Sequence, residues 1–181
     1  MQKEVPHSEA SAVLCPRELA IAIVKDAGGT CNPIALGFVM RTSIRPPMLA
    51  VSIVPTHHSA GAIRHAGEFV VAYPSEHQAE ETLLYGTKSG RDVNKLALTG
   101  AQTQPATVID GVLLADAVAN FECKLVGEMT TGDHVIFVGE VVCSHLNEAP
   151  PGRCYIIGPG HRLGGIEACR TGGGASPAPP S

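Results

Sequence analysis

Short apolar runs separated by turn residues recur along the whole chain, and this pattern constrains the fold more than any other feature. The run over 134–142 (HVIFVGEVV) is the strongest, because it is rich in β-branched residues and follows the turn Thr131-Gly132-Asp133. Further strands are expected over 19–24, 33–43, 48–54, 68–73, 119–126 and 153–157. Helical patterns are short and lie at 59–66, 75–84 and 92–98. Many strands with few helices predict a mainly β barrel with helical covers, rather than a βαβ sheet.

The two ends of the chain differ from its middle. Residues 1–15 are mixed and polar, which predicts a loose N-terminal arm. Residues 169–181 are rich in Gly, Pro and Ser, which predicts a disordered tail. One domain over 16–168 remains, and it is large enough to bury its own core.

The composition excludes several classes of function. The net charge is −4, no Lys/Arg run occurs, and aromatic residues make up only 4%, so we expect no nucleic-acid partner. No apolar run approaches the roughly 20 residues of a membrane span and no signal peptide is visible, which predicts a cytoplasmic protein without a membrane partner. Six cysteines show neither a CxxC pair nor zinc-finger spacing, so we expect reduced thiols and no metal site.

Three polar segments between strands and helices could bind a charged ligand. The segment 87–92 (TKSGRD) could hold a phosphate through its cations and backbone N–H groups, or it could be a surface loop before a helix capped by Asp92. The segment 55–61 (PTHHSAG) could attract an anion to a helix start, or Ser59 could simply cap that helix. His134 could contact a ligand at a barrel mouth, or bond to a neighbouring backbone group in a turn. The residue pattern alone leaves these alternatives open.

Taken in their order along the chain, these three segments resemble those of the flavin reductase-like, FMN-binding split-barrel family, and within it the flavoredoxin-like branch. The similarity extends from about Leu19 to Ile166, and 86–95 (GTKSGRDVNK) is its most specific part. The other matching stretches are 46–53 (PPMLAVSI), 67–71 (GEFVV) with Pro74-Ser75, 121–124 (FECK), and 132–134 (GDH) with 137–141 (FVGEV).

This resemblance implies a six-stranded antiparallel split β-barrel with a few short covering helices, paired as a homodimer with FMN near the interface. By position in the family, the isoalloxazine ring would lie beside Ala35, Leu36, Gly37 and Phe38. The ribityl chain and phosphate would follow Ser52, Ile53 and Ser59, and Lys88, Ser89 and Gly90 would close over the phosphate. His134 would face the nicotinamide and is the catalytic candidate.

The resemblance also implies a function, namely NAD(P)H-dependent flavin reduction by an FMN-binding oxidoreductase. FMN would be the cofactor and NAD(P)H the hydride donor, so no catalytic triad is required of the chain. Two alternatives stay open, a flavoredoxin-like electron carrier that retains its FMN and a non-catalytic flavin-binding module. Beyond the second subunit, the expected partner is an electron-acceptor protein or a monooxygenase component.

Overall fold

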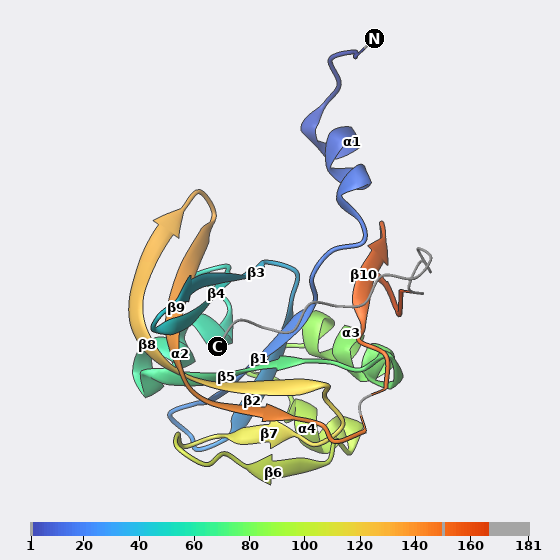
Figure 1. Ribbon diagram of the computed structural model, residues 1–181. Helices are drawn as coiled ribbons and strands as arrows, with labels where there is room; N and C mark the ends of the chain where they lie inside the picture. Colours follow the sequence, from blue (N-terminus) through green and yellow to red (C-terminus); the bar gives the residue numbers. More distant parts are fainter. Residues whose placement is uncertain (1, 150, 167–181) are drawn as a thin grey trace.

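The computed structural model describes residues 2–149 and 151–166, and its centre is one antiparallel sheet curled into a barrel (Figure 1). Along the sheet the strand order is β2-β1-β5-β8-β9-β4-β3. The strands are β1 (Ala20–Lys25), β2 (Cys31–Leu36), β3 (Val39–Ile44), β4 (Pro47–Ile53), β5 (Glu68–Tyr73), β8 (Ala119–Thr131) and β9 (His134–Leu146). Two small sheets lie outside it and pair β6 (Thr103–Pro105) with β7 (Val112–Leu114) and β10 (Tyr155–Gly158) with β11 (Arg162–Gly164).

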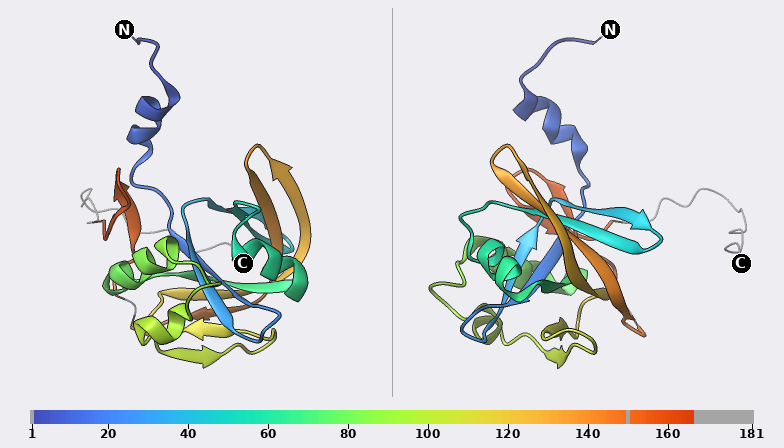
Figure 2. Two further views of the ribbon diagram at one scale, coloured as in Figure 1. Left: turned by 180° about the vertical axis from the view of Figure 1, so that it is seen from behind. Right: turned by 90° about the vertical axis from the view of Figure 1, so that its left-hand side faces the viewer.

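Short helices cover parts of this barrel. They are α1 (His7–Ser11), η1 (Ala12–Leu14), α2 (His58–Ala66), η2 (Glu76–Gln78), α3 (Ala79–Thr87) and α4 (Lys95–Thr99). The predicted loose arm contains α1 and η1, which bury no residue and project away from the barrel (Figures 1 and 2). Within the described residues, no helix combines the length and apolar character needed to span a membrane. The predicted disordered tail, 169–181, lies outside the described residues.

The structure confirms the mainly β, antiparallel split barrel and changes one strand of the prediction. The expected strand over 33–43 is two strands, because the chain leaves β2 at one edge of the sheet and enters β3 at the other. The main sheet therefore has seven strands where six were expected. Gly37 lies at this crossing, where an added Cβ would come within 2.8 Å of Ile156 Cδ1.

Two helix starts also differ from the prediction. The helix expected over 92–98 begins at Lys95, because Asn94 accepts a hydrogen bond from the Ala97 N–H while the Asp92 N–H is used in a turn with Ser89. Helix α2 begins at His58, which places Ser59 inside the helix instead of at its cap. Strands β6, β7 and β11 were not predicted, because each has only three residues, too few to show an alternation of apolar and polar side chains.

The hydrophobic residues divide into a barrel core and an outer layer. Inward-facing side chains of the barrel pack with the buried face of α2, including Ile63, Phe69 and Phe137. On the other face of β1 and β5, Tyr85 of α3 and Leu114 of β7 belong to a second cluster. Helix α3 and the 79–114 region are thereby held against β2, beside the mouth of the barrel.

A buried carboxylate ties the connection between β6 and β7 to the sheet. Glu122 is fully buried, and its two oxygens accept hydrogen bonds from the backbone N–H groups of Thr107, Val108 and Ile109 at 2.7–3.0 Å. The His145 ring lies 2.6 Å from the same carboxylate. Burial alone would raise the pKa of Glu122, but these hydrogen bonds outweigh it and lower the pKa to about 2. The side chain therefore stays ionised inside the fold.

Candidate functional site

An apolar cleft opens at the barrel mouth, where the chain crosses from β2 to β3. Its volume is about 290 Å³, and we call it the mouth cleft. Strand β2 supplies one wall, the end of β4 a second, helix α3 a third, and β10 with β11 closes the far side. The lining residues include Ile34, Ala35, Leu36, Gly37, Phe38, Ser52, Ile53, Val54, Leu83, His134, Ile156 and Leu163.

The crossing segment is fixed by backbone bonding. The Ser52 N–H donates to the Phe38 carbonyl at 3.0 Å, which continues the β3–β4 pairing beyond Val39. Ala35 and Leu36 remain paired with β1. The cleft therefore presents a rigid backbone edge beside apolar side chains, an arrangement suited to a flat ring with a few polar edge atoms.

A second, polar cleft of about 420 Å³ adjoins the first, and we call it the loop cleft. The two clefts share Ile34, His57, Gly86 and Thr87, so they form one continuous depression. The loop cleft lies between the start of α2 and the loop that follows α3. Its remaining lining residues are Asn32, Thr56, His58, Ser59, Tyr85, Lys88, Ser89, Gly90, Arg91 and Lys95.

The loop cleft is electropositive. Lys88 and Arg91 bring cationic side chains to it, and Arg91 is held by a 3.0 Å bond to the Thr56 carbonyl. None of its lining residues is an aspartate or glutamate. The start of α2 also faces it, so an anion there gains from unpaired backbone N–H groups.

Lys95 is the buried cation of this cleft. Its ammonium group donates to the carbonyls of Pro33 and Tyr85 at 2.6 and 2.9 Å, which joins β2 to the last turn of α3. Burial disfavours the charged form and lowers the pKa of Lys95 to about 8. Lys95 therefore holds β2 and α3 together at the wall of the loop cleft, and its ammonium group keeps most of its charge at neutral pH.

Asn32 and Gly90 meet closely at the floor of the loop cleft. Asn32 is buried and donates through Nδ2 to the Ser59 hydroxyl at 2.8 Å. Its Oδ1 is buried and has no hydrogen-bond donor among the described residues. A Cβ on Gly90 would lie 2.1 Å from that oxygen, so the loop can approach only because residue 90 lacks a side chain. An acceptor left open in a polar cleft favours a ligand with hydroxyl groups.

His134 lies at the rim of the mouth cleft, at the tip of the β8–β9 hairpin. Its Nδ1 is 2.7 Å from Asp133 Oδ1, and its ring meets Phe38 edge to face at 5.4 Å between centroids. The hydrogen bond with His134 and the attraction between the two groups lower the pKa of Asp133. These contacts orient the imidazole at the cleft entrance.

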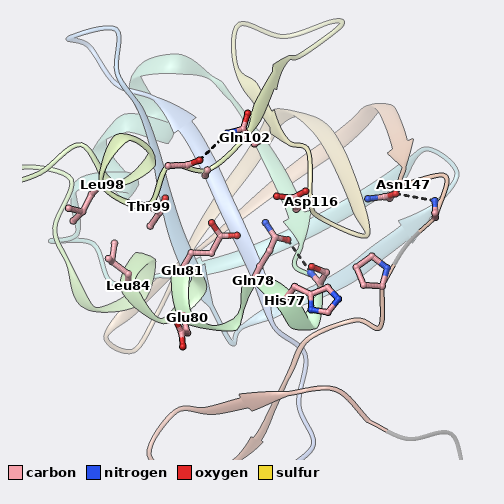
Figure 3. A pocket seen from close by; sticks show the side chains of 15 residues that line it. His77, Gln78, Glu80, Glu81, Leu84, Leu98, Thr99, Gln102, Asp116 and Asn147 are labelled. Carbon is pink, nitrogen blue, oxygen red and sulfur yellow. Dashed lines mark hydrogen bonds between the residues drawn. The ribbon is translucent and has the colours of Figure 1, made fainter.

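A larger cavity, of about 930 Å³, shares no lining residue with these two clefts (Figure 3). The side chains of Glu80, Glu81 and Asp116 line it, together with Gln78 and Gln102. Three carboxylates disfavour a phosphate or any other anion there. The electropositive loop cleft is therefore the better candidate for an anionic ligand, despite its smaller volume.

The structure brings every predicted site residue to these two joined clefts. Seven of them, namely Ala35, Leu36, Gly37, Phe38, Ser52, Ile53 and His134, line the mouth cleft, and Ser59, Lys88, Ser89 and Gly90 line the loop cleft. Sequence reasoning missed Asn32, Arg91, Lys95 and Ile156. Arg91 and Lys95 lie inside the 86–95 motif and could have been found there, whereas nothing near Asn32 or Ile156 in the sequence indicates a site.

Comparison with known proteins identifies the family of this chain. The family model described as "Flavin reductase like domain" matches residues 13–160. An NADH-dependent FMN reductase, AsuE2 of Streptomyces nodosus subsp. asukaensis, is 28% identical over 141 residues, which cover 75% of this chain and 72% of that one. An uncharacterised protein of Archaeoglobus fulgidus is 34% identical over 114 residues, which cover 61% of this chain and slightly less than two thirds, 63%, of that one.

The fold is similar to that of the flavoredoxin from Methanosarcina acetivorans. The TM-score is 0.82 at 21% identity, and the match covers 97% of this chain and 95% of that one. The family model alone spans most of the chain, and it includes every lining residue of both clefts except His161 and Leu163. This chain belongs to the flavin reductase-like family.

Proposed function

We propose that this protein binds FMN across the two clefts and uses it to carry hydride from NAD(P)H to flavin. The observation that carries this proposal is the continuity of an apolar slot with an electropositive cleft. A planar ring fits the slot, and a phosphate dianion fits the cations of the loop cleft. AsuE2, which is NADH-dependent and reduces FMN, supports the same reaction class.

The residues present fit FMN at three places. Backbone groups of Gly37 and Phe38 would meet the ring edge, and Asn32 Oδ1 would accept from a ribityl hydroxyl. Lys88 and Arg91 would hold the phosphate, with the start of α2 beside it. When bound, the flavin supplies the hydride-accepting chemistry. The chain positions the ring, excludes water through the apolar walls, and orients the second substrate at His134.

The absorbance spectrum before and after dialysis tests this function and separates the alternatives. A reductase that exchanges its flavin should lose FMN on dialysis and oxidise NADH only when flavin is added. Retained FMN with slow NADH oxidation would favour the electron carrier. A colourless protein that binds no added FMN would contradict both and leave the non-catalytic module.

Removing the Lys88 ammonium group should weaken FMN much more than riboflavin, because only FMN carries the phosphate. A charge-assisted hydrogen bond contributes roughly 1.5–3 kcal/mol, so Lys88→Ala should lower FMN affinity about ten- to hundred-fold. Quenching of flavin fluorescence measures both affinities. Lys124→Ala, on the exposed part of β8, is the matched control. An equal loss of affinity for FMN and riboflavin would instead support the alternative interpretation, in which 87–92 is a surface loop.

His134→Ala should impair use of NAD(P)H while FMN affinity stays nearly constant, because His134 lies at the cleft entrance. Loss of one polar contact corresponds to roughly a five- to thirty-fold fall in kcat/KM. Steady-state kinetics with saturating FMN measure this fall, and His65→Ala, an exposed residue on α2, serves as control. A lower melting temperature with unchanged kinetics would instead show that His134 only supports the hairpin turn.

We further propose that the protein is a homodimer, with an acceptor protein or monooxygenase component as a later partner. The outer face of the β3-β4-β9-β8 part of the sheet carries exposed apolar side chains, because Phe38, Met40 and Met129 are each more than half exposed. This face carries a groove of about 480 Å³ that shares Phe38, Ser52 and His134 with the mouth cleft. A second copy seated there would border the FMN ring.

Light scattering at micromolar concentration should therefore give twice the chain mass. Met40→Glu should shift the protein to monomer and weaken FMN, because it places a charge in the apolar face. Leu146→Glu changes an even more exposed apolar residue at the far end of β9 and should leave the mass unchanged. A wild-type monomer would contradict the shared site.

A further inference from the structure

Three side chains with metal-binding atoms meet on the outer face of the barrel, far from the two clefts. Their ligand atoms, one each from Glu122, Cys143 and His145, all lie within 4.8 Å of one another. Glu122 on β8 is directly opposite Cys143 on β9, and a β-bulge follows this pair. His145 is two residues beyond Cys143, so it faces the same side of the strand. Strand pairing, not sequence spacing, brings the three together.

The carboxylate of this cluster is held in place by the backbone. Three backbone N–H groups fix Glu122 and occupy both lone pairs of Oε2 and one of Oε1. The remaining lone pair of Oε1 points at His145 Nε2, 2.6 Å away. A carboxylate oxygen fixed in this way beside an imidazole offers two metal ligands that are already close together.

We propose that Glu122, Cys143 and His145 form a zinc site that is separate from the flavin site. Oxygen, sulfur and nitrogen ligands together suit Zn²⁺, which accepts all three at about 2.0–2.3 Å. Tetrahedral geometry at those lengths separates ligand atoms by roughly 3.3–3.6 Å. The distance between His145 Nε2 and Glu122 Oε1 must therefore increase, and Cys143 Sγ must move closer to both atoms. The side chains of Cys143 and His145 are partly exposed and can make these changes by rotating about their side-chain bonds.

The protons balance in this binding step. Zinc takes the place of the proton between His145 Nε2 and Glu122 Oε1, and that proton shifts to Nδ1, so the imidazole stays neutral. The Cys143 thiol proton leaves to solvent as the sulfur–zinc bond forms. The fourth position remains for water, because Cys143 and His145 are both partly open to solvent.

The site would stabilise the fold instead of taking part in hydride transfer. His145 and His134 are 11 residues apart on β9, or about 36 Å along an extended strand. Zinc would clamp β8, β9 and the 107–109 segment, which Glu122 already joins. Zinc binding and flavin binding can therefore be measured independently.

The test is equilibrium dialysis of the full-length protein against Zn²⁺ after treatment with chelator. A Cys169→Ser background removes the thiol that lies outside the described residues. One zinc ion per chain is expected at micromolar concentration. Cys143→Ser and His145→Asn should each weaken it by at least about 100-fold, because ligand loss exceeds the 10–100-fold typical of supporting residues. Both variants keep the backbone bonds of Glu122, so they should fold, and melting curves check this.

Controls are Cys31→Ser, another half-buried thiol, and His65→Asn, an exposed imidazole on α2. Neither should change zinc affinity, and none of the four variants should change FMN affinity. Zinc at 100 times its dissociation constant should raise the melting temperature by roughly 5–10 °C in wild type and not in Cys143→Ser. No zinc uptake at millimolar zinc, or uptake indifferent to both Cys143→Ser and His145→Asn, would overturn the proposal.

Discussion

Glu122→Gln should lower the free energy of unfolding by about 3 kcal/mol at pH 7 in chelator-treated protein. The substitution places an NH₂ group or a weaker acceptor against three backbone donors that now bond to a carboxylate. Buried donors that lose their acceptor are costly, because no water replaces it. A chain of this length should lose roughly 6–12 °C of melting temperature.

The same carboxylate should make the stability of the wild type depend on acid. Its pKa is lowered from 4.5 to about 2 in the fold, so the unfolded chain takes up the proton first as the pH falls. The stabilisation is complete above pH 4.5 and disappears between pH 4.5 and 2. A difference of this size corresponds to about 3 kcal/mol.

Urea unfolding between pH 7 and 2.5 measures both effects. Glu122→Gln should flatten the acid-dependent fall, while Glu148→Gln, which changes an exposed carboxylate, should leave the profile as in wild type. An unchanged slope in Glu122→Gln would show that other carboxylates control acid unfolding. Flavin affinity measured at pH 7 on the folded variant should stay constant, because Glu122 lies away from both clefts.

Gly90→Ala should reduce FMN affinity about 10- to 100-fold and lower the free energy of unfolding by roughly 1–3 kcal/mol, the usual range for overpacking. The new methyl group would lie 2.1 Å from Asn32 Oδ1 and 3.1 Å from His58 Cδ2. Neither neighbour can yield freely, because Asn32 is bonded to Ser59 and His58 is 3.0 Å from Asp26. The loop must move outward and carry Lys88 away from the phosphate position.

A double-mutant cycle makes this prediction specific. If Gly90 acts through Asn32, then Asn32→Ala with Gly90→Ala should bind FMN as well as Asn32→Ala alone, and the two effects should not add. The control is Gly61→Ala in helix α2, where an added Cβ meets nothing within 4 Å and helix propensity favours alanine. Full additivity of the two changes would contradict the contact.

Much of the barrel was readable because its strands carry their own signal. The run over 134–142 predicts β9, because β-branched residues follow a Gly-Asp turn. Pro55 predicts the end of β4, because proline cannot donate a hydrogen bond to the strand ladder. The division of 33–43 was not readable. The local pattern is compatible with an extended chain throughout, and only closure of the sheet sends β2 and β3 to opposite edges.

The sequence by itself determined the mainly β class, the family resemblance, and the eleven residues that gather at the two clefts. The residues came from the family resemblance, which continuous segments of the sequence carry, above all 86–95. Only the tertiary structure decided that Asn32 meets Gly90, that Lys95 bridges β2 and α3, and that Glu122 meets Cys143 and His145. Apart from the Lys95–Tyr85 bond, these contacts join residues 21 to 62 positions apart. No local pattern encodes them, because strand register and barrel closure set which distant side chains lie together.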